Sequence, residues 1–501
     1  MALPANTPVR QHSAPESIAD QLSRSFMEQV ANKLPPDLDV VDRLCHMALS
    51  RDNEQTRKAA VVALYKNIIE PLCDDFSAAG VDICSRVLLR MTAFLRTRTE
   101  GGALDKLLGD LHFHDEHQLF SRYRRIKKER SLSGSMRRNI RKILVLSRVT
   151  VGADVAMTSI IVHRLLVTFP QAELIVFGPQ HLAEIFSELP RVHWTKVHYH
   201  REGGLVGRMT YFTSLYRLLE QEWQAASVEN TLLFDPDSRL SQLGLIPLID
   251  DRSYCYFPSR EMEQHSSHRL SSLTNVWLNR LLDEKKEIAP RISIRPVHQQ
   301  TVRNFFTRFP EESKKIVINL GVGNDPRKRL PDPFEEELLY CLLQHDRAVV
   351  VLDSGCHPDE RKRAIKLVDK ISGRGFATAH ISEKDFNQKK PDFKQGLVCV
   401  QGGIGMLSAL IDQADVFFGY DSCCQHLATA RQTRSVICFA GAVNDRFFSR
   451  WMPIDNRGRT TTVRMEGIDN LSIPELQRLA IKFSELIFQD DGKHHVRPNI
   501  R

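Results

Sequence analysis

The sequence predicts an α/β protein with two Rossmann-like, doubly wound domains, preceded by an all-helical domain. From Lys142 onward, short apolar runs typical of buried parallel strands alternate with helical patterns. The alternation stops before residue 287 and starts again with the apolar run Ile316 to Leu320, which indicates two separate sheets. Before Lys142, apolar residues recur at spacings of three and four, and no alternating strand pattern occurs.

Composition fits a globular protein of several domains. The chain has 501 residues, 42% hydrophobic and 26% charged, which allows two to four domains with cores of their own. No uninterrupted apolar run reaches about 18 residues, and the N-terminus has no apolar signal region, so we expect neither a membrane span nor secretion. We therefore expect a cytoplasmic protein. Peripheral contact with the inner face of the membrane is considered below.

The ten cysteines show no paired spacing and no histidine partners at zinc spacing. Several stand inside apolar runs, and we expect them to be small buried hydrophobes in a reducing compartment. Disulfides or a metal site are the less favoured alternative.

The helical part runs from Ser17 to about His117. Five segments carry the helical period, and none repeats at a fixed interval: ESIADQLSRSFMEQVANKL, VVDRLCHMALS, TRKAAVVALYKNIIEPLCDDF, VDICSRVLLRMTAFLRTR and GALDKLLGDLHF.

A basic run, Arg122 to Lys142, follows and holds a single acid, Glu129. One interpretation is a solvated connector. The other is a patch that meets anionic lipid head groups or a phosphorylated acceptor. Tyr123 is the only aromatic residue in the run, so we expect no nucleic-acid partner.

The first alternating set starts with the strand Ile143 to Ser147 and a helix from Asp154 to Phe169. It continues through the strands AELIVFG, HWTKVHYH, TLLFD and YCYFP, the helices HLAEIFSEL and SLYRLLEQEW, and the helical stretch LSSLTNVWLNRLLDEKK. The second set follows Pro296 and contains IVINL, AVVVLDSG, TAHIS and LVCVQG as strands, with VRNFFTRF, PFEEELLYCLLQ and DERKRAIKLVDKI as helices.

These patterns divide the chain into seven segments. We expect a disordered lead (1–16), a helical domain (17–120), a basic connector (121–141), an N-terminal Rossmann-like domain (142–286), a linker (287–295), a C-terminal Rossmann-like domain (296–490) and a tail (491–501).

The most informative stretch, Leu407 to Gly441, reads as helix, strand, polar turn, helix and strand. The turn Tyr420-Asp421-Ser422 stands between a buried strand and a helix start, where unpaired N–H groups and the helix dipole bind anions. A plain N-cap is the alternative interpretation.

This stretch resembles the donor-binding segment of the lipopolysaccharide heptosyltransferases, (L/I)-x-x-A-D-x-x-(V/I)-G-x-D-(S/T)-G-x-x-H-L-x-A-A. The matching residues are Ile411, Ala414, Asp415, Gly419, Asp421, Ser422, His426, Leu427 and Ala430. Phe418, Thr429 and above all Cys423 depart from the pattern, because the family has glycine in the place of Cys423. The resemblance covers about Lys142 to Trp451 and implies the GT-B architecture of glycosyltransferases.

The resemblance also implies a donor site for a nucleotide sugar. Its residues are Asp421, Ser422, Cys423 and His426, together with Gly321, Gly323 and Lys328 after the strand IVINL. Lys328 matches a lysine that binds phosphate in the family's K-R-W-P or K-H-W-P cluster. Leu330 replaces the tryptophan. A solvated basic turn is the alternative for this loop.

Asp154 matches the family's catalytic base, in the loop Val151-Gly152-Ala153-Asp154-Val155, although one extra residue separates it from the glycine. A carboxylate at a helix start is also a natural cap, so a structural role stays open. For the acceptor we expect Gly152, His200, Arg201, Arg208 and Arg239, with an ordinary polar loop as the alternative for residues 198–208.

Asp235-Pro-Asp237 has the spacing of a metal-binding D-x-D motif. We expect no metal there and no cofactor, because positive side chains and helix dipoles take over the metal's role in two-domain transferases of this type. Asp235 is expected to end a strand, while Asp237, Ser238 and Arg239 line the cleft.

The function that the resemblance implies is inverting, metal-independent glycosyl transfer, as in lipopolysaccharide biosynthesis. A heptose or related hexose would pass from a nucleotide diphosphate to a hydroxyl of a cell-surface glycan or lipid-linked precursor. Weak contact of residues 122–142 with an anionic membrane would place the enzyme peripherally at the inner face. The alternative is a non-catalytic binding or scaffold protein with a degenerate glycosyltransferase fold.

Overall fold

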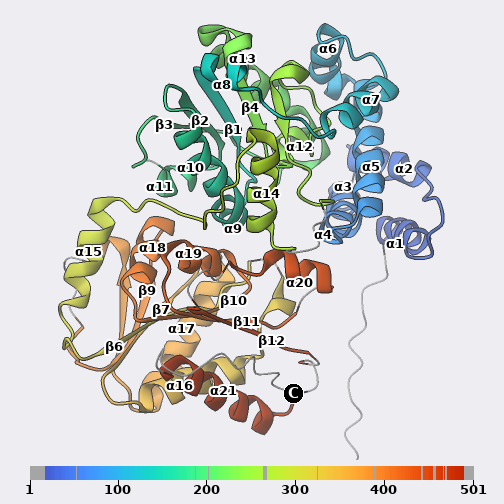
Figure 1. Ribbon diagram of the computed structural model, residues 1–501. Coiled ribbons are helices and arrows are strands. Elements are labelled where there is room, and N and C mark those ends of the chain that lie inside the picture. The colour runs from blue at the N-terminus through green and yellow to red at the C-terminus, as the bar shows by residue number, and fades with distance from the viewer. Residues whose placement is uncertain are drawn as a thin grey trace, which may run out of the picture. The chain divides into compact units, whose positions relative to one another are not determined.

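The computed structural model of the chain forms two compact units, each treated separately (Figure 1). One holds residues up to Arg122 together with residues 200–214, and the other holds residues 123–199 and those from Leu215 onward. The described residues are 17–51, 53–186, 188–200, 202–262, 268–323, 325–386, 388, 391–441, 444–454, 458–466, 468 and 471–489. The lead 1–16, the tail 491–501 and Arg201 lie outside this set.

The first unit is helical, as the sequence predicts. Ser17, Asn53 and Ser77 cap three of its helices with side-chain oxygens that accept from backbone N–H groups of the first turn. Its elements are α1 (Ile18–Ala31), α2 (Asp39–Ala48), α3 (Glu54–Val62), the π-helix η1 (Ala63–Ile69), α4 (Glu70–Asp74), α5 (Ala78–Arg96), η2 (Thr99–Gly101), α6 (Gly102–Asp110), most of α7 (Glu116–Ile126) and α12 (Gly204–Thr210).

The basic run is largely structured, since it contains the end of α7 and the helix α8 (Gly134–Asn139). Lys127 pairs with Glu261 at 2.6 Å, and Arg130 donates to the carbonyls of residues 251, 252 and 254. These side chains therefore hold the run against other parts of the second unit, to which it belongs from Tyr123 onward. Five other basic residues of the run are exposed, and one of them, Arg125, pairs with Asp251: Arg124, Arg125, Lys128, Arg138 and Arg141.

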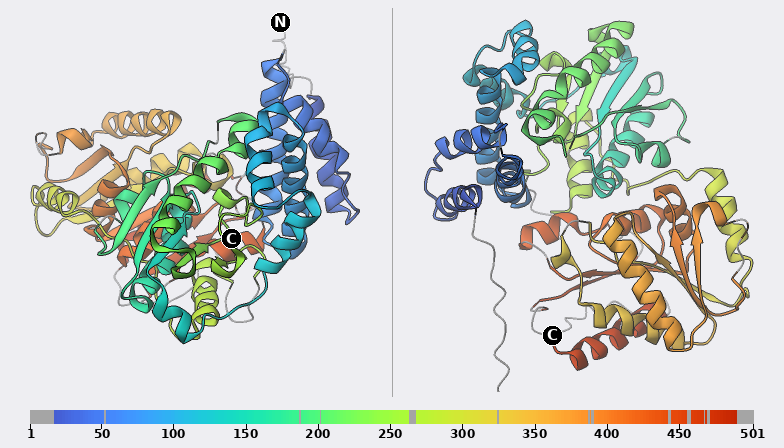
Figure 2. Two further views of the ribbon diagram at one scale, coloured as in Figure 1. Left: turned by 90° about the horizontal axis from the view of Figure 1, so that it is seen from above. Right: turned by 180° about the vertical axis from the view of Figure 1, so that it is seen from behind.

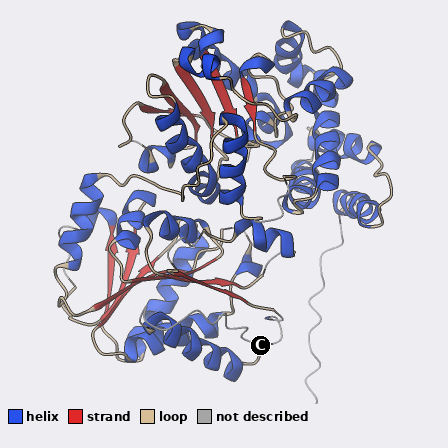
Figure 3. Cartoon of the chain, viewed as in Figure 1, coloured by secondary structure: helices blue, strands red, loops and turns tan. Residues whose placement is uncertain are grey.

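The second unit contains two parallel sheets, which Figure 3 shows in red. The first has the order β3-β2-β1-β4-β5. Its central strands β1 and β4 are almost completely buried, because helices cover the sheet. Its strands are β1 (Lys142–Leu146), β2 (Glu173–Gly178), β3 (Val192–Lys196), β4 (Thr231–Asp235) and β5 (Tyr254–Tyr256). Its helical elements are α9 (Val151–Ala153), η3 (Asp154–Thr158), α10 (Ser159–Thr168), α11 (Leu182–Ile185), α13 (Phe212–Ala226), η4 (Val228–Asn230), η5 (Arg239–Ser241), η6 (Asp251–Ser253) and α14 (Leu270–Leu282).

Several predicted elements of this sheet domain are too long, among them the helical stretch predicted to reach Lys286, which ends at Leu282 as α14. The strand predicted to reach His200 ends at Lys196, because β3 lies at the sheet edge and its only neighbour, β2, ends at Gly178 opposite Lys196. The helix predicted over 181–189 is confined to α11, which ends at Ile185.

The second sheet has the order β12-β11-β10-β6-β7-β9-β8. Its strands are β6 (Lys314–Asn319), β7 (Ala348–Asp353), β8 (Thr378–Ser382), β9 (Gly396–Gln401), β10 (Val416–Tyr420), β11 (Ser435–Phe439) and β12 (Thr460–Arg464). Its helical elements are α15 (Pro296–Phe306), η7 (Pro326–Lys328), α16 (Asp332–Gln344), α17 (Pro358–Gly373), η8 (Glu383–Asp385), α18 (Ile404–Asp412), α19 (Cys423–Arg431), α20 (Asp445–Trp451) and α21 (Ile473–Phe488).

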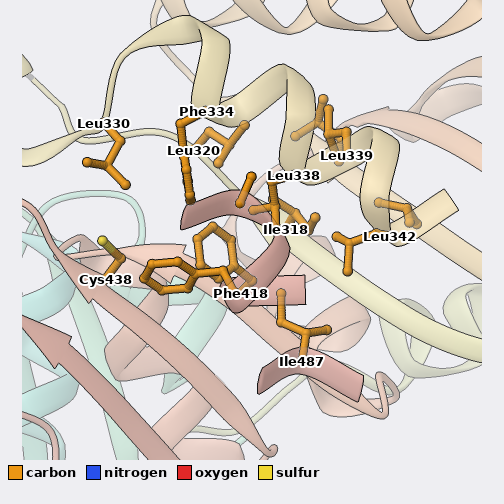
Figure 4. Packing of buried hydrophobic residues seen from close by; sticks show 14 of the residues in the cluster. Ile318, Leu320, Leu330, Phe334, Leu338, Leu339, Leu342, Phe418, Cys438 and Ile487 are labelled. Carbon is orange, nitrogen blue, oxygen red and sulfur yellow. The ribbon is translucent and has the colours of Figure 1, made fainter. Parts of the chain in front are cut away.

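A single apolar cluster fills one face of this sheet. Leu338, Leu339 and Leu342 of α16 meet Ile318 and Phe418 from neighbouring strands β6 and β10 (Figure 4). Helices α16 and α21 pack against each other over this cluster, whereas α18 and α19 lie on the opposite face (Figure 2). The predicted α/β class with two doubly wound sheets is therefore confirmed.

Within the described residues, one helical stretch, Val151–Thr168, is long and apolar enough to cross a membrane. The structure buries 72% of it, as expected for a core helix that covers a sheet.

Candidate functional site

The carboxyl ends of three neighbouring strands of the second sheet are joined by polar side chains. Asn319 ends β6, and its amide donates to Asp353 Oδ2 at the end of β7 over 2.7 Å. On the other side, Ser422 Oγ donates to Asn319 Oδ1 over 3.4 Å, just after β10. Ligands of open α/β sheets bind at this edge, outside the carboxyl ends of the strands.

The loop after β10 is held by an ion pair with a residue far away in the sequence. Lys328 Nζ lies 2.7 Å from Asp421 Oδ2, and the two side chains are only 19% and 8% exposed. Gln425 donates to the other carboxylate oxygen of Asp421, also over 2.7 Å. Ser422 is the N-cap of α19, so a fixed ammonium group lies beside the N-terminus of a nine-residue helix. Both features favour a bound anion.

The predicted donor residues Cys423 and His426 lie in the first turn of α19. Burial lowers the pKa of His426 to about 4, so its imidazole is neutral at pH 7. Cys423 is half-buried, and its Sγ lies 3.8 Å from that of Cys424.

Gly321 lines a small recess at the ends of β6 and β7, with room for about one water, and Gly323 follows it in the same loop. Gly323 has φ +64°, a left-handed conformation that favours glycine, and its N–H donates to Glu360 over 3.3 Å. The polar side chains of the recess are those of Asp353, Ser354, Glu360 and Arg363. Burial raises the pKa of Asp353 to about 6.

Asp154, the predicted base, is fully buried at the start of the π-helix η3. Its two carboxylate oxygens accept four hydrogen bonds, from Ser147 Oγ (2.6 Å), the Arg148 N–H (2.8 Å), Thr158 Oγ1 (2.8 Å) and His181 Nε2 (2.8 Å). A π-helical turn accommodates one residue more than an α-helical turn, which gives the extra residue of this loop a place. The carboxylate anchors the loop, but it is not the predicted helix cap, because the helical segment begins at Val151 and none of the four donors is a backbone N–H of that segment.

Gly152 brings the loop of the first sheet next to the helix of the second. A Cβ atom on Gly152 would lie 3.1 Å from His426 Cδ2 and 3.3 Å from Cys423 Cα. Glycine is therefore favoured by close approach, since a Cβ atom would push these neighbours away by a few tenths of an ångström. Predicted donor and base loops meet at this point.

The remaining predicted residues come from other elements. Arg239 lies in η5, after β4. His200 and Arg208 belong to the helical unit, where the Arg208 guanidinium lies 4.2 Å from the centre of the Tyr65 ring. An ordinary structural role explains this contact of Arg208.

The aspartates of the D-x-D motif are occupied by protein groups. Asp235 accepts from the Ser238 N–H, and Asp237 pairs with Arg260 at 2.7 Å. Asp235 does end β4, as predicted. Within the described part of the chain, no three His, Cys, Asp or Glu side chains are grouped to hold a metal ion.

The sequence interpretation missed Asn319, Asp353, Gln425 and His181. One signal was present for Asp353. The dipeptide Asp353-Ser354 stands at the end of an apolar strand, just as Asp421-Ser422 does. Carboxyl ends of neighbouring parallel strands meet at one edge, so both pairs were candidates for one site.

Comparison with known proteins shows a likeness of fold. No family model and no curated protein matches the chain. Among solved structures, a family 9 glycosyltransferase from Veillonella parvula is 13% identical, with a TM-score of 0.50 over 69% of this chain and 97% of its own. The ADP-heptose lipopolysaccharide heptosyltransferase II of E. coli is 14% identical, with a TM-score of 0.45 over 69% and 98%. The E. coli heptosyltransferase WaaC with ADP is 13% identical, with a TM-score of 0.43 over 68% of this chain and 98% of its own. The Veillonella structure shows that the two sheets adopt the GT-B fold.

Proposed function

We propose that the chain is a metal-independent, inverting glycosyltransferase that takes a heptose or related hexose from a nucleotide diphosphate. The observation that carries the proposal is the ammonium of Lys328, fixed by Asp421 beside the N-terminus of α19. A leaving nucleoside diphosphate gains negative charge as the sugar departs, and preorganised cations and amides stabilise that charge. Solved heptosyltransferases of similar fold hold ADP and an ADP-linked sugar analogue, which supports this donor class.

The chain of hydrogen bonds from Ser422 through Asn319 to Asp353 gives the donor site a second part. We infer that the ribose lies outside the recess at the end of β7, where the carboxylates of Asp353 and Glu360 can accept from its hydroxyls. The diphosphate would then extend toward Lys328.

The proposed acceptor is a hydroxyl of a cell-surface glycan or lipid-linked precursor, as the resemblance implies. A cytoplasmic enzyme for such an acceptor visits a membrane surface, and Arg124, Lys128, Arg138 and Arg141 are exposed for weak contact with anionic lipid.

The test is a thermal-shift panel of nucleoside diphosphates and nucleotide sugars, followed by an assay for sugar transfer or hydrolysis. A ligand at about 100 times its dissociation constant stabilises the folded state by about 2.7 kcal/mol. A shift with turnover supports the proposal. A shift without turnover identifies a nucleotide-sugar-binding protein with a degenerate transferase fold, and no shift with any nucleotide contradicts both.

A further inference from the structure

Two neighbouring strands of the first sheet bring an aspartate and a histidine together. Strands β1 and β2 are parallel neighbours, so the loops that follow them lie at the same edge. Asp154 follows β1 and His181 follows β2, and the imidazole Nε2 lies 2.8 Å from Asp154 Oδ2. The pair is separated by 27 residues in sequence and forms only through the sheet.

The hydrogen bonds fix the form of this histidine. An ionised carboxylate can only accept hydrogen bonds, and Asp154 accepts three others besides that from His181, so Nε2 carries the hydrogen and donates it to the carboxylate. Nδ1 then holds a lone pair, and it forms no hydrogen bond within the described residues. A neutral imidazole with one nitrogen oriented by a carboxylate can accept a proton at the other.

Exposure separates the two side chains. Asp154 is completely buried, whereas 13% of the His181 side chain is exposed. The carboxylate therefore has no direct access to a substrate hydroxyl, and the imidazole is the only member of the pair that reaches solvent.

The pair also lies near the proposed donor site. Gly152, two residues before Asp154, approaches Cys423 and His426 at the start of α19. Glu184, three residues after His181, accepts a hydrogen bond from the Gly405 N–H at the start of α18. Both loops that carry the pair therefore touch the second sheet domain.

We propose that His181 is the catalytic base of the transfer and that Asp154 is its positioning residue. The inference rests on the proposed function. The acceptor oxygen forms a bond to the anomeric carbon, and the bond from that carbon to the phosphate oxygen breaks with its electron pair leaving on the nucleoside diphosphate. The acceptor proton moves to Nδ1 of His181, and Asp154 stays ionised beside the resulting imidazolium.

The test measures release of nucleoside diphosphate from the ADP-, UDP- or GDP-linked sugar that the parent protein turns over fastest, with water or a glycan as acceptor. His181→Gln keeps an amide N–H near the position of Nε2 and so keeps a donor to Asp154, but it cannot accept a proton. Thr158→Val removes a different donor to the same carboxylate, and His163→Gln makes the same substitution at a histidine that bonds only to the Ser159 carbonyl of its own helix.

We expect His181→Gln to lower kcat by about 100-fold or more, with KM for the nucleotide sugar and the melting temperature near those of the parent. Thr158→Val should lose less than about tenfold, and His163→Gln should match the parent. His181→Gly should regain turnover as imidazole is added to the solution, which a structural role would not produce.

If His181→Gln retains turnover comparable to that of Thr158→Val, and imidazole does not rescue His181→Gly, the inference is wrong while the proposed function stands. A parent protein that turns over no nucleotide sugar overturns the proposed function and the inference together.

Discussion

Asp154 and Asp421 occupy equivalent places in the two sheet domains, yet their partners differ. Each follows the carboxyl end of a buried parallel strand and stands where a helical element begins. Asp154 accepts from two hydroxyls, an amide and an imidazole, whereas Asp421 pairs with the ammonium of Lys328. The same local pattern therefore gives an anchored carboxylate in one domain and a fixed cation in the other.

The difference comes from residues distant in sequence. His181 and Lys328 are 27 and 93 residues from the aspartates that they contact. A histidine beside a saturated carboxylate can move a proton, and a lysine beside a helix N-terminus can hold an anion. The comparison teaches that the partner, and not the aspartate, sets the chemistry of each loop.

The largest effect should come from Asp154→Asn. An amide keeps the size of the side chain but presents hydrogens to groups that themselves donate, and it cannot orient His181 as an anion does. We expect turnover to fall by about 100-fold or more while affinity for the nucleotide sugar stays near that of the parent. The free energy of unfolding should fall by about 1–3 kcal/mol, because buried donors lose their acceptor.

Steady-state kinetics and urea unfolding measure the two effects. Asp359→Asn serves as the control, since that side chain is 76% exposed on α17. Full turnover in Asp154→Asn would show that Asp154 takes no part in the reaction. The aspartates of both loops would then serve only to hold structure.

The order of helices and strands could be predicted because most strands are uniformly apolar and buried on both faces. The runs that became β1, β6 and β10 illustrate this. The edges of the sheets were harder. The run TTTVR forms β12 but carries polar threonines, and β3 is shorter than its pattern because its neighbour ends at Gly178.

The candidate site could be predicted in part. The turn at Asp421 and the lysine at position 328 were named from motifs, and the structure brings them together. Asn319 and His181 were not named, because an amide at a strand end and a histidine in a turn have no distinctive local pattern. Their roles depend on strand adjacency, which places β10 beside β6 and β1 beside β2.

The next effect tests the cationic side of the comparison. Lys328→Ala should weaken binding of the nucleoside diphosphate product by about 1.5–3 kcal/mol, the range for hydrogen bonds to charged groups. Isothermal titration calorimetry with ADP, UDP and GDP measures the change. Lys362→Ala is the matched control, because that side chain is 77% exposed in the same domain. Equal affinities of the parent and Lys328→Ala would show that Lys328 serves only as the ion-pair partner of Asp421 and does not bind the diphosphate.

A third aspartate, Asp353, differs from both. Its carboxylate accepts a side-chain hydrogen bond from Asn319, and in the described residues it has neither the four donors of Asp154 nor an ion pair like that of Asp421. Its pKa is raised to about 6 in the folded protein because of burial, so the folded state binds more protons than the unfolded state between about pH 4 and 6. This carboxyl therefore reduces stability as the pH rises through that range. Asp353→Asn should raise the free energy of unfolding by about 3 kcal/mol at pH 7 and change it little at pH 4.

Urea unfolding at the two pH values checks the sign of this effect. A variant less stable than the parent at pH 7 would show that the Asn319 hydrogen bond to the carboxylate outweighs the cost of its burial. Asp353 would then resemble Asp154, an anchored carboxylate, more than an open polar group of the recess.

The smallest effect concerns the point where the two loops meet, at Gly152 and Cys423. The glycine of the first loop lies so close that an added Cβ would be 3.3 Å from Cys423 Cα, and the Cys423 side chain stands at the first position of α19. Cys423→Gly would uncover the amides at this helix start, so affinity for a nucleoside diphosphate should rise by up to about tenfold, or about 1.4 kcal/mol. The helix should lose less than about 1 kcal/mol of stability, since the glycine penalty is smaller in the first turn than in a helix interior.

Cys423→Ser keeps the size of the side chain and should bind like the parent, which separates crowding from the chemistry of the thiol. If Cys423→Gly binds no more tightly than Cys423→Ser in calorimetry, the cysteine does not limit access to the amides, and the ammonium of Lys328 alone distinguishes the second loop from the first.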